Sequence, residues 1–285
     1  MESESLPESV AARSAEAAEP VKEKESWWAT LRFFLLLFLA ALLLRSLVIA
    51  PFSIPSGSML PRLMIGDYLF VSKWSYGYSR FSLPFGLFGA EGRFMGGLPA
   101  RGDVVVFRYP AAEEDWVKRV IGLPGDTVEV RDGAVILNGE PLPRQRIADY
   151  AAPVSPNSPC RVTMDGAVRR LRDGGGGGIC AYPRFRETLP DGTSYEILDQ
   201  IVDGEADTFE PVRVPADHVF VMGDNRDESA DSRFSIEQEG VGMLPVDNLL
   251  GRVLVTFWST DGSAEWIKPW TWLSAARWDR VGRTG

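Results

Sequence analysis

The sequence predicts a mainly β fold, in which a β-barrel-like main domain carries an inserted β-rich module and follows one N-terminal transmembrane helix. Three observations support this class. Residues 33–44 are twelve consecutive apolar residues near the N-terminus. Beyond residue 50, short runs rich in Val, Ile and Phe are bounded by Gly, Pro and Asp, as in strands joined by turns. Helical periodicity is scarce in the same region.

The N-terminal part of the chain divides into a polar and an apolar segment. Residues 1–26 contain seven Glu and little apolar surface, so we expect a disordered acidic tail. Residues 27–50 are long enough to span a bilayer, which needs about 20 apolar residues. Trp27 and Trp28 would lie at the headgroups. We therefore predict a transmembrane anchor over residues 27–50.

Two other interpretations of the anchor remain open. A buried helix of a soluble protein would have the same composition. A cleaved signal peptide is disfavoured, because Pro51 would follow the cut and a long acidic tail precedes the apolar core. Slightly more Lys and Arg precede the segment than follow it, which predicts a cytoplasmic N-terminus and an exported main body.

The main β domain is expected over residues 51–126 and 213–260, with strands at 66–73, 101–107, 115–121, 219–222 and 251–258. Residues 127–212 have a different texture, with short strands at 127–131 and 134–137, and form the predicted insert. The five glycines at 174–178 lack the Lys-Ser or Lys-Thr that follows a phosphate-binding loop, so they predict a flexible loop.

Two apolar surface segments have open roles. Residues 81–99 are a loop rich in Phe, Leu and Met, and residues 261–285 form a Trp-rich C-terminal segment. Each would suit contact with a bilayer or packing on the protein's own core.

Composition also limits the partners. A net charge of −9 argues against nucleic acid, which is bound by clustered Lys and Arg. Cys160 and Cys180 are too few for a four-coordinate zinc site, but a bridge between them would fit an oxidising compartment. The polar loop 223–233 lacks the glycine and glutamate of a calcium loop. We expect no cofactor and no metal.

The residues with catalytic potential lie in two stretches. Ser56 and Ser58 flank a glycine just after the anchor. The single histidine, His218, lies in a strand-like run where a structural role is expected, so a serine enzyme would need another base. In the strand 115–121, Lys118 shares a face with Trp116 and is either snorkelling at an edge or buried. Burial would lower its pKa and make it a general base.

Four ordered motifs in the sequence resemble those of bacterial type I signal peptidases. They lie at residues 55–59, 101–107, 117–126 and 222–233. The resemblance implies a membrane-bound serine endopeptidase that removes N-terminal signal peptides from exported preproteins with a Ser-Lys dyad. It further implies a single-pass protein of the bacterial inner membrane, with its catalytic domain on the periplasmic side. Its partners would be signal peptides, the lipid bilayer and the nearby secretion translocon.

The resemblance also implies roles for individual residues. Ser58 would be the nucleophile and Lys118 the general base. Ser229 would hydrogen-bond and orient the lysine amine. Ser56 and the backbone N–H of Ser58 would form the oxyanion hole.

The same resemblance implies two supporting ion pairs, Asp224 with Arg119 and Asp231 with Arg233. Small substrate pockets are expected near Ile54 and residues 104–106.

The sequence departs from the family after Arg233, where residues 234–243 lack the expected aromatic-glycine pair. One alternative function is a membrane-tethered β-barrel that binds exported partners without cutting them. Another is a Ser-Lys protease of narrower range, such as a conjugation or pilin-processing peptidase. Self-cleaving repressors fit less well, because they lack a spanning anchor.

Overall fold

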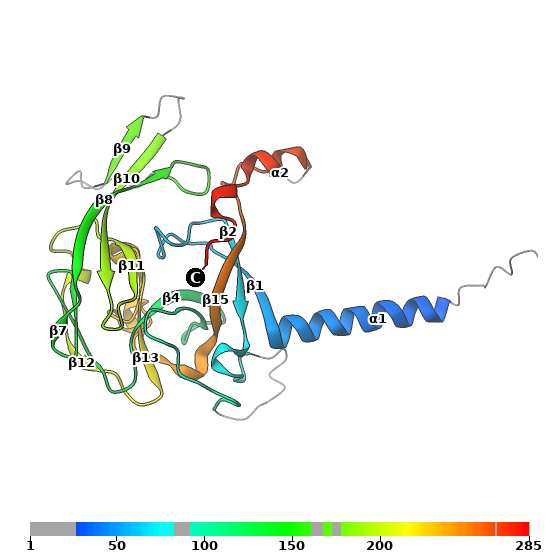
Figure 1. Ribbon diagram of the computed structural model, residues 1–285, viewed down its shortest axis with the longest axis horizontal. Coiled ribbons are helices and arrows are strands. Elements are labelled where there is room, and N and C mark those ends of the chain that lie inside the picture. The colour runs from blue at the N-terminus through cyan, green and yellow to red at the C-terminus, as the bar shows by residue number, and fades with distance from the viewer. Residues whose placement is uncertain (1–26, 83–91, 161–167, 173–177, 266, 285) are drawn as a thin grey trace, which may run out of the picture. The chain divides into compact units, whose positions relative to one another are not determined.

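The structure is a computed structural model (Figure 1), and it describes residues 27–82, 92–160, 168–172, 178–265 and 267–284. The predicted acidic tail over residues 1–26 lies outside the described residues. So do residues 83–91 of the apolar loop and most of the glycine run.

The N-terminal helix α1 covers Trp27–Leu43 and continues as a π-helical turn over Leu44–Val48. Together they form 22 residues, in which the most apolar stretch of 18 residues has a mean hydropathy of 2.3, long and apolar enough to cross a membrane. The predicted anchor extended to Ala50, but the helix ends two residues earlier. Ile49 and Ala50 belong instead to a strand, because they pair with Ser72 and Val71 of its neighbour.

The remainder of the chain, from Leu42 onward, is one compact unit built on a seven-stranded antiparallel sheet in the order β1-β2-β15-β3-β4-β13-β14. Every strand predicted for the main domain is present in it. The strands are β1 (Ile49–Ser53), β2 (Asp67–Ser72), β3 (Val104–Arg108), β4 (Asp115–Gly122), β13 (His218–Met222), β14 (Leu244–Pro245) and β15 (Leu249–Ser259).

Residues between β4 and β13 form two further four-stranded sheets. In one, β10 pairs with β8, β9 and β11, and in the other the order is β12-β5-β6-β7. These strands are β5 (Thr127–Arg131), β6 (Ala134–Leu137), β7 (Glu140–Pro141), β8 (Arg144–Pro153), β9 (Arg169–Arg172), β10 (Gly178–Thr188), β11 (Ser194–Leu198) and β12 (Phe209–Arg213). The predicted fold class, mainly β with one N-terminal apolar helix, is confirmed.

Helical structure after β1 is short in the described residues. Helix α2 covers Trp270–Ala275, and single 3-10 turns connect strands. The 3-10 turns are η2 (Trp74–Tyr76), η4 (Glu205–Asp207), η5 (Arg226–Glu228), η6 (Ile236–Gln238), η7 (Val246–Asn248) and η8 (Trp278–Arg280).

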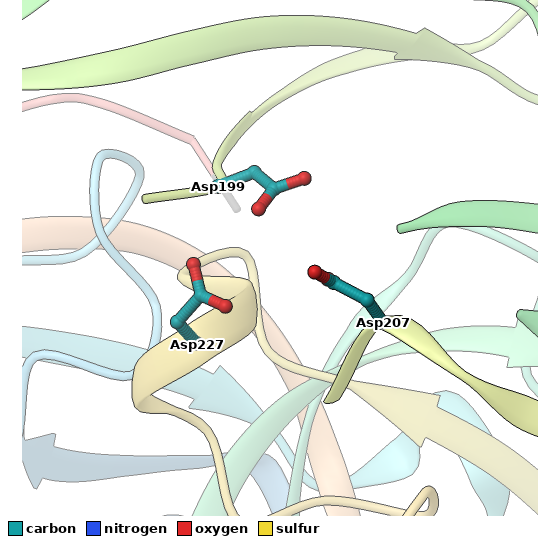
Figure 2. A group of neighbouring side chains, drawn as sticks. All are labelled: Asp199, Asp207 and Asp227. Atoms are coloured by element: carbon teal, nitrogen blue, oxygen red, sulfur yellow. The ribbon is translucent and has the colours of Figure 1, made fainter. Parts of the chain in front are cut away.

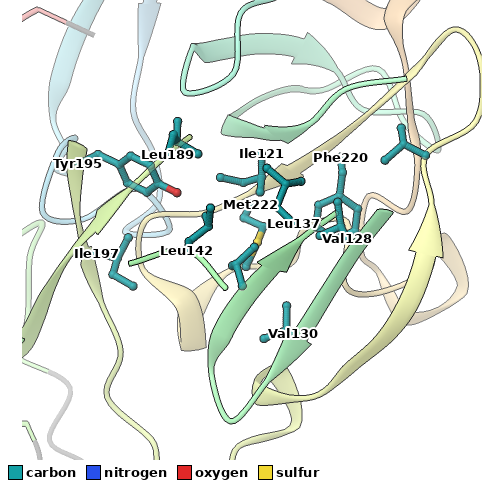
Figure 3. Close-up of a cluster of buried hydrophobic side chains, with 12 residues drawn as sticks. Ile121, Val128, Val130, Leu137, Leu142, Leu189, Tyr195, Ile197, Phe220 and Met222 are labelled. Atoms are coloured by element: carbon teal, nitrogen blue, oxygen red, sulfur yellow. The ribbon is translucent and has the colours of Figure 1, made fainter. Parts of the chain in front are cut away.

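One hydrophobic cluster joins the main sheet to the predicted insert (Figure 3). Ile121, Phe220 and Met222 come from β4 and β13, and they pack with residues of β5, β6 and β11 such as Val128 and Ile197. Each such side chain contributes about 1.5–3 kcal/mol on burial. The main sheet and the insert therefore share a core, and the exact division into domains stays a prediction.

The disulfide that the two cysteines allowed is formed. Cys160 and Cys180 are bonded, with their Cα atoms 5.4 Å apart. Cys180 is buried in a cluster with Tyr182 and Leu198, and Leu60 packs against this cluster. The bridge thus lies in the same apolar cluster as a residue of the Ser58 turn.

The two apolar surface segments each contain residues that pack on the protein and residues that are exposed. In the loop 81–99, Phe81 packs on a core cluster, whereas Phe94 and Met95 are exposed. In the C-terminal segment, Trp270 and Trp278 are both exposed, although Trp278 also packs edge-on against Trp258 at 5.5 Å between ring centroids. Membrane contact by these segments stays a prediction.

Candidate active site

The turn that carries Ser58 connects β1 to β2 and is fixed at its base. The backbone N–H of Ile54 donates to Asp67 O at 2.9 Å, and that of Gly66 donates to Ile54 O at 3.0 Å. Met59 and Leu63 are 1% and 2% exposed and anchor the turn in the core. Apolar side chains thus hold a polar turn in place.

Lys118 lies in the middle of β4, which is paired with β3 on one side and β13 on the other. Strand alternation places Lys118 on the face of Trp116, whose ring centroid is 5.6 Å from the ammonium nitrogen. The lysine is 4% exposed, and its Nζ donates to Ser58 Oγ at 2.7 Å. Of the two interpretations left open by the sequence, the buried lysine is correct.

Burial lowers the pKa of Lys118 to about 8 from an ordinary value of 10.5. The carboxylates of Asp231 and Asp224 oppose this change, while Arg233 adds to it. At pH 7 roughly a tenth of such a lysine is neutral, compared with roughly three in ten thousand for an exposed one. A base that can accept the hydroxyl proton of Ser58 is therefore present at neutral pH.

The expected oxyanion donors lie beside Ser58. Ser56 Oγ is 3.4 Å from Ser58 Oγ. Within the described part of the chain, no group accepts a hydrogen bond from the backbone N–H of Ser58. The hydroxyl of Ser56 and the backbone N–H of Ser58 could therefore both donate to a substrate oxygen.

Ser229 does not make the hydrogen bond to Lys118 that the resemblance implied. Its hydroxyl is buried, and it has no hydrogen-bond partner among the described residues. It lies against Gly223, where an added Cβ would be 2.2 Å from Ser229 Oγ and 2.6 Å from the carbonyl oxygen of Ser58. Gly223 is therefore required by the close approach of these groups.

A cavity of about 650 Å³ contains Ser58 and Lys118. Its apolar wall includes Phe52, Ile54, Met59, Ile65, Trp116 and Val117. The expected contribution of residues 104–106 is wrong: Val105 and Val106 are fully buried in core clusters, and Val104 borders a different cavity. That second cavity, of about 900 Å³, has several arginines in its lining and includes neither Ser58 nor Lys118.

Comparisons with known proteins assign the family. A model of the family described as "Signal peptidase, peptidase S26" matches residues 27–258. The chain belongs to this signal peptidase family. A signal peptidase I of Rickettsia akari is 30% identical over 91% of this chain and 92% of that protein. One of Rickettsia canadensis is 32% identical over 85% and 88%.

A solved signal peptidase I of Enterococcus faecalis is 24% identical, with a TM-score of 0.28 over 55% of this chain and 97% of that one. The predicted membership in the signal peptidases, and with it the prediction of a protease, is confirmed by the family match.

In this signal peptidase both supporting ion pairs are present and buried. Arg119 donates to Asp224 through Nε at 2.7 Å and through a terminal nitrogen at 2.6 Å. Arg233 holds Asp231 in the same two-pronged way, at 2.9 Å for each bond. Burial raises the pKa of Asp231, but the charge and hydrogen bonds of Arg233 outweigh it and leave the pKa lowered. Asp231 also accepts the N–H of Gly223 at 3.0 Å, which fixes the loop beside Ser58.

Asn225 is a site residue that sequence reasoning missed, although it lies in the motif 222–233. It is fully buried. Its side-chain Nδ2 donates to Gly57 O at 3.1 Å, and its backbone N–H donates to Ser58 O at 3.0 Å. Asn225 therefore holds the turn that carries Ser58 by two hydrogen bonds.

Arg226 and Glu187 form a second contact that the sequence did not reveal. The pair joins the loop 223–233 to β10 of the insert, with Arg226 Nη1 donating to Glu187 Oε1 at 2.9 Å, and both residues are buried. No sequence signal marks the pair, because the partners are 39 residues apart.

Three aspartates gather near the same loop (Figure 2). Carboxylate oxygens of Asp199, Asp207 and Asp227 lie within 4.8 Å of one another. Each already has a protein partner: Asp199 pairs with Arg144, Asp207 accepts the N–H of Gly204, and Asp227 accepts two backbone N–H groups. These existing partners account for the cluster as a structural feature, so it does not identify a metal site.

His218 lies outside the candidate site. It does not line the cavity of Ser58, and its Nδ1 lies 2.8 Å from Ala216 O.

Proposed function

We propose that this protein is a membrane-anchored serine endopeptidase that removes N-terminal signal peptides from exported preproteins. Ser58 is the nucleophile and neutral Lys118 the general base. The observation that carries the proposal is the 2.7 Å contact between Lys118 Nζ and Ser58 Oγ in a buried site. Family membership supports the substrate class, because relatives with this sequence pattern are named signal peptidase I.

Acylation begins when the scissile carbonyl of the substrate reaches Ser58. Lys118 accepts the hydroxyl proton as Oγ attacks the carbonyl carbon, and charge develops on the carbonyl oxygen. The backbone N–H of Ser58 and the hydroxyl of Ser56 stabilise that oxygen, at about 2.7–4 kcal/mol for each well-placed donor. The protonated lysine then donates its proton to the departing amine. This step leaves the signal peptide esterified to Ser58 and releases the mature protein.

Deacylation uses the same groups, with water as the attacking group and Ser58 Oγ as the leaving group. Lys118, neutral again, takes a proton from water as the water oxygen attacks the ester. The resulting ammonium returns the proton to Ser58 Oγ, and the signal peptide leaves as a carboxylic acid. Asp224 with Arg119 and Asp231 with Arg233 serve as supports that hold the loop and β4 in register rather than as proton carriers.

The proposed location is supported by the apolar N-terminal helix and by family membership. Residues 27–48 anchor the protein in the bacterial inner membrane with a single span, and the catalytic unit lies on the periplasmic side near the secretion translocon. Ser58 follows Val48 by ten residues, so the nucleophile works where a signal peptide leaves the bilayer. The apolar wall of the cavity, including Ile54 and Met59, favours small apolar residues before the cut.

Incubation of the detergent-solubilised full chain with a preprotein tests this function, with sequencing of the new N-terminus. We expect one cut after a small residue, and loss of at least about a thousandfold in rate for Ser58→Ala and for Lys118→Ala, because single deletions in such catalytic units cost that much.

Two variants serve as matched controls. Ser274→Ala removes an exposed hydroxyl from α2, and Lys73→Met removes another buried lysine that does not line the cavity. Both should process the preprotein normally. Stable binding of the preprotein without a cut would favour the binding-protein alternative, and full activity of Lys118→Ala would exclude the dyad.

A further inference from the structure

The insert contacts the loop that carries Asn225 through the end of β11 and the residues that follow it. The backbone N–H of Leu198 donates to Asp224 O at 2.8 Å. The backbone N–H groups of Gln200 and Ile201 both donate to Asp227 Oδ2, the carboxylate seen at the 3-10 turn in Figure 2. These three bonds fix residues 198–201 of the insert against the loop that carries Asn225.

The side chain of Gln200 makes the next contact. It is 3% exposed, and its Nε2 donates to Oδ1 of the fully buried Asn225. Only one assignment of hydrogen-bond donors and acceptors fits these contacts. Gly57 O can only accept, so Asn225 must turn its Nδ2 toward it and its Oδ1 away, and Oδ1 then needs a donor. Gln200 Nε2 is that donor.

The orientation of Gly57 C=O decides the orientation of an oxyanion donor. Gly57 C=O and the N–H of Ser58 belong to the same planar peptide unit, and in a trans peptide they point in opposite directions. A hydrogen bond that holds the carbonyl therefore also aims the N–H of Ser58. That N–H has no acceptor among the described residues.

We propose that Gln200 is a positioning residue for catalysis: it fixes the Asn225 amide, which holds Gly57 C=O and so aims the N–H of Ser58 at the substrate oxyanion. The proposal rests on the proposed function of Ser58 as nucleophile. It assigns a role to the insert, which supplies a buried amide that the main sheet lacks at this position. Without that donor, the Asn225 amide is free to turn over and set its oxygen against the oxygen of Gly57.

Two substitutions of similar length separate the donor from the packing. Gln200→Met keeps the volume but cannot donate, and Gln200→Glu presents only acceptors to Asn225 Oδ1 when ionised. We expect kcat to fall about tenfold or more for Met and further for Glu, because a misaimed oxyanion donor loses part of the 10²–10³-fold that such a donor supplies. KM should stay within about twofold, since the donor acts on the transition state. Gln145→Met, at an exposed glutamine of β8, is the matched control and should leave both constants unchanged.

A double-mutant cycle tests whether Gln200 acts through Asn225. In an Asn225→Ala background, Gln200→Met should have no further effect on kcat, whereas a merely structural role would lower kcat by the same factor in both backgrounds. All rates are referred to the folded fraction measured by circular dichroism. If Asn225→Ala does not fold, the ranking of Met and Glu at unchanged KM decides the question.

The outcomes distinguish this inference from the proposed function. If wild type cleaves the preprotein, Ser58→Ala does not, and Gln200→Met retains wild-type kcat, the positioning role is overturned while the function stands. If Ser58→Ala remains active, the proposed function fails. The contact between Gln200 and Asn225 is then tested by NMR, from the side-chain amide signals of Asn225 in full-length protein labelled with ¹⁵N-asparagine. Unchanged signals in Gln200→Met would also overturn the proposal that Gln200 fixes the Asn225 amide.

Discussion

Lys118 Nζ lies 2.7 Å from Ser58 Oγ although the two residues are 60 positions apart in the chain. Ser58 comes from the turn after β1, and Lys118 from the centre of β4, a strand paired on both sides. Lys118 is only 4% exposed, and this removal from water shifts the lysine toward its neutral form. This shift is built into the fold before any substrate binds.

The first prediction concerns the pH dependence of cleavage. Since burial sets the pKa of Lys118 at about 8, kcat/KM should rise about tenfold per pH unit below that value and level off above it. Between pH 6 and pH 8 the neutral fraction rises by roughly fiftyfold. Initial rates on a peptide substrate across pH 5.5–10 measure the limb. A limb centred near the ordinary lysine value would contradict the buried base.

A second prediction concerns stability. The pKa of Lys118 is about 8 in the folded state and 10.5 in an exposed lysine, so the protonated form is the one that folding disfavours. The cost is complete below pH 8, shrinks between pH 8 and 10.5 and vanishes above that range. At pH 7 it is about 3 kcal/mol, less about 1 kcal/mol for the lost hydrogen bond to Ser58 when the lysine is replaced.

Lys118→Met should therefore be more stable than wild type by about 2 kcal/mol at pH 7, and the difference should shrink as the pH rises and reverse to about 1 kcal/mol less stable above pH 10.5, where only the lost hydrogen bond remains. Denaturant unfolding of both proteins at several pH values in the same detergent measures it. Lys268→Met, at an exposed lysine, is the control and should show no such pH-dependent difference. A pH-independent gain would mean that packing rather than charge is responsible.

The sequence was sufficient for the strands and for singling out Ser58 and Lys118, whose side chains meet in the structure, because alternation and local motifs carry that information. It was not sufficient for the burial of Lys118: the pattern around Trp116 and Val120 is the same in an edge strand and in an interior one, and only the pairing with β3 and β13 decides. The contacts of Asn225 and Gln200 were equally hidden. Asn225 contacts Gly57 across 168 residues of sequence, and no local pattern encodes such a contact.

Gly223→Ala should abolish activity. A methyl group there would be 2.6 Å from the carbonyl oxygen of Ser58 and 2.2 Å from Ser229 Oγ, so the nucleophile turn must shift. Gly57→Ala is the matched control, because a Cβ at that position meets nothing closer than 3.4 Å. Thermal melts should separate the two variants, with Gly57→Ala close to wild type. A fully active Gly223→Ala would show that the turn tolerates displacement.

Loss of the disulfide should lower stability with little effect on the chemistry. The bridge closes a segment with a sequence separation of 20. Chain-entropy arguments give about 3 kcal/mol for a loop of this length. The Cys160→Ser, Cys180→Ser double variant should unfold at correspondingly lower denaturant, while kcat of the folded protein at 25 °C stays within about twofold because neither cysteine lines the cavity. Unfolding curves and initial rates measure the two effects, and a large loss of kcat in folded protein would refute this separation.

Ser229→Ala provides the last test, because its effects on stability and rate should have opposite signs. The hydroxyl of Ser229 is buried and lacks a partner among the described residues, so its removal should leave stability unchanged or raise it by about 1 kcal/mol. Catalytic hydrogen bonds often tighten only when substrate is bound. If Ser229 then orients the amine of Lys118, kcat should fall about tenfold or more with KM unchanged. Ser232→Ala is the contrast: its hydroxyl accepts the N–H of Val221 at 2.9 Å, so that variant should lose stability. A rise in KM at constant kcat for Ser229→Ala would reject the orienting role.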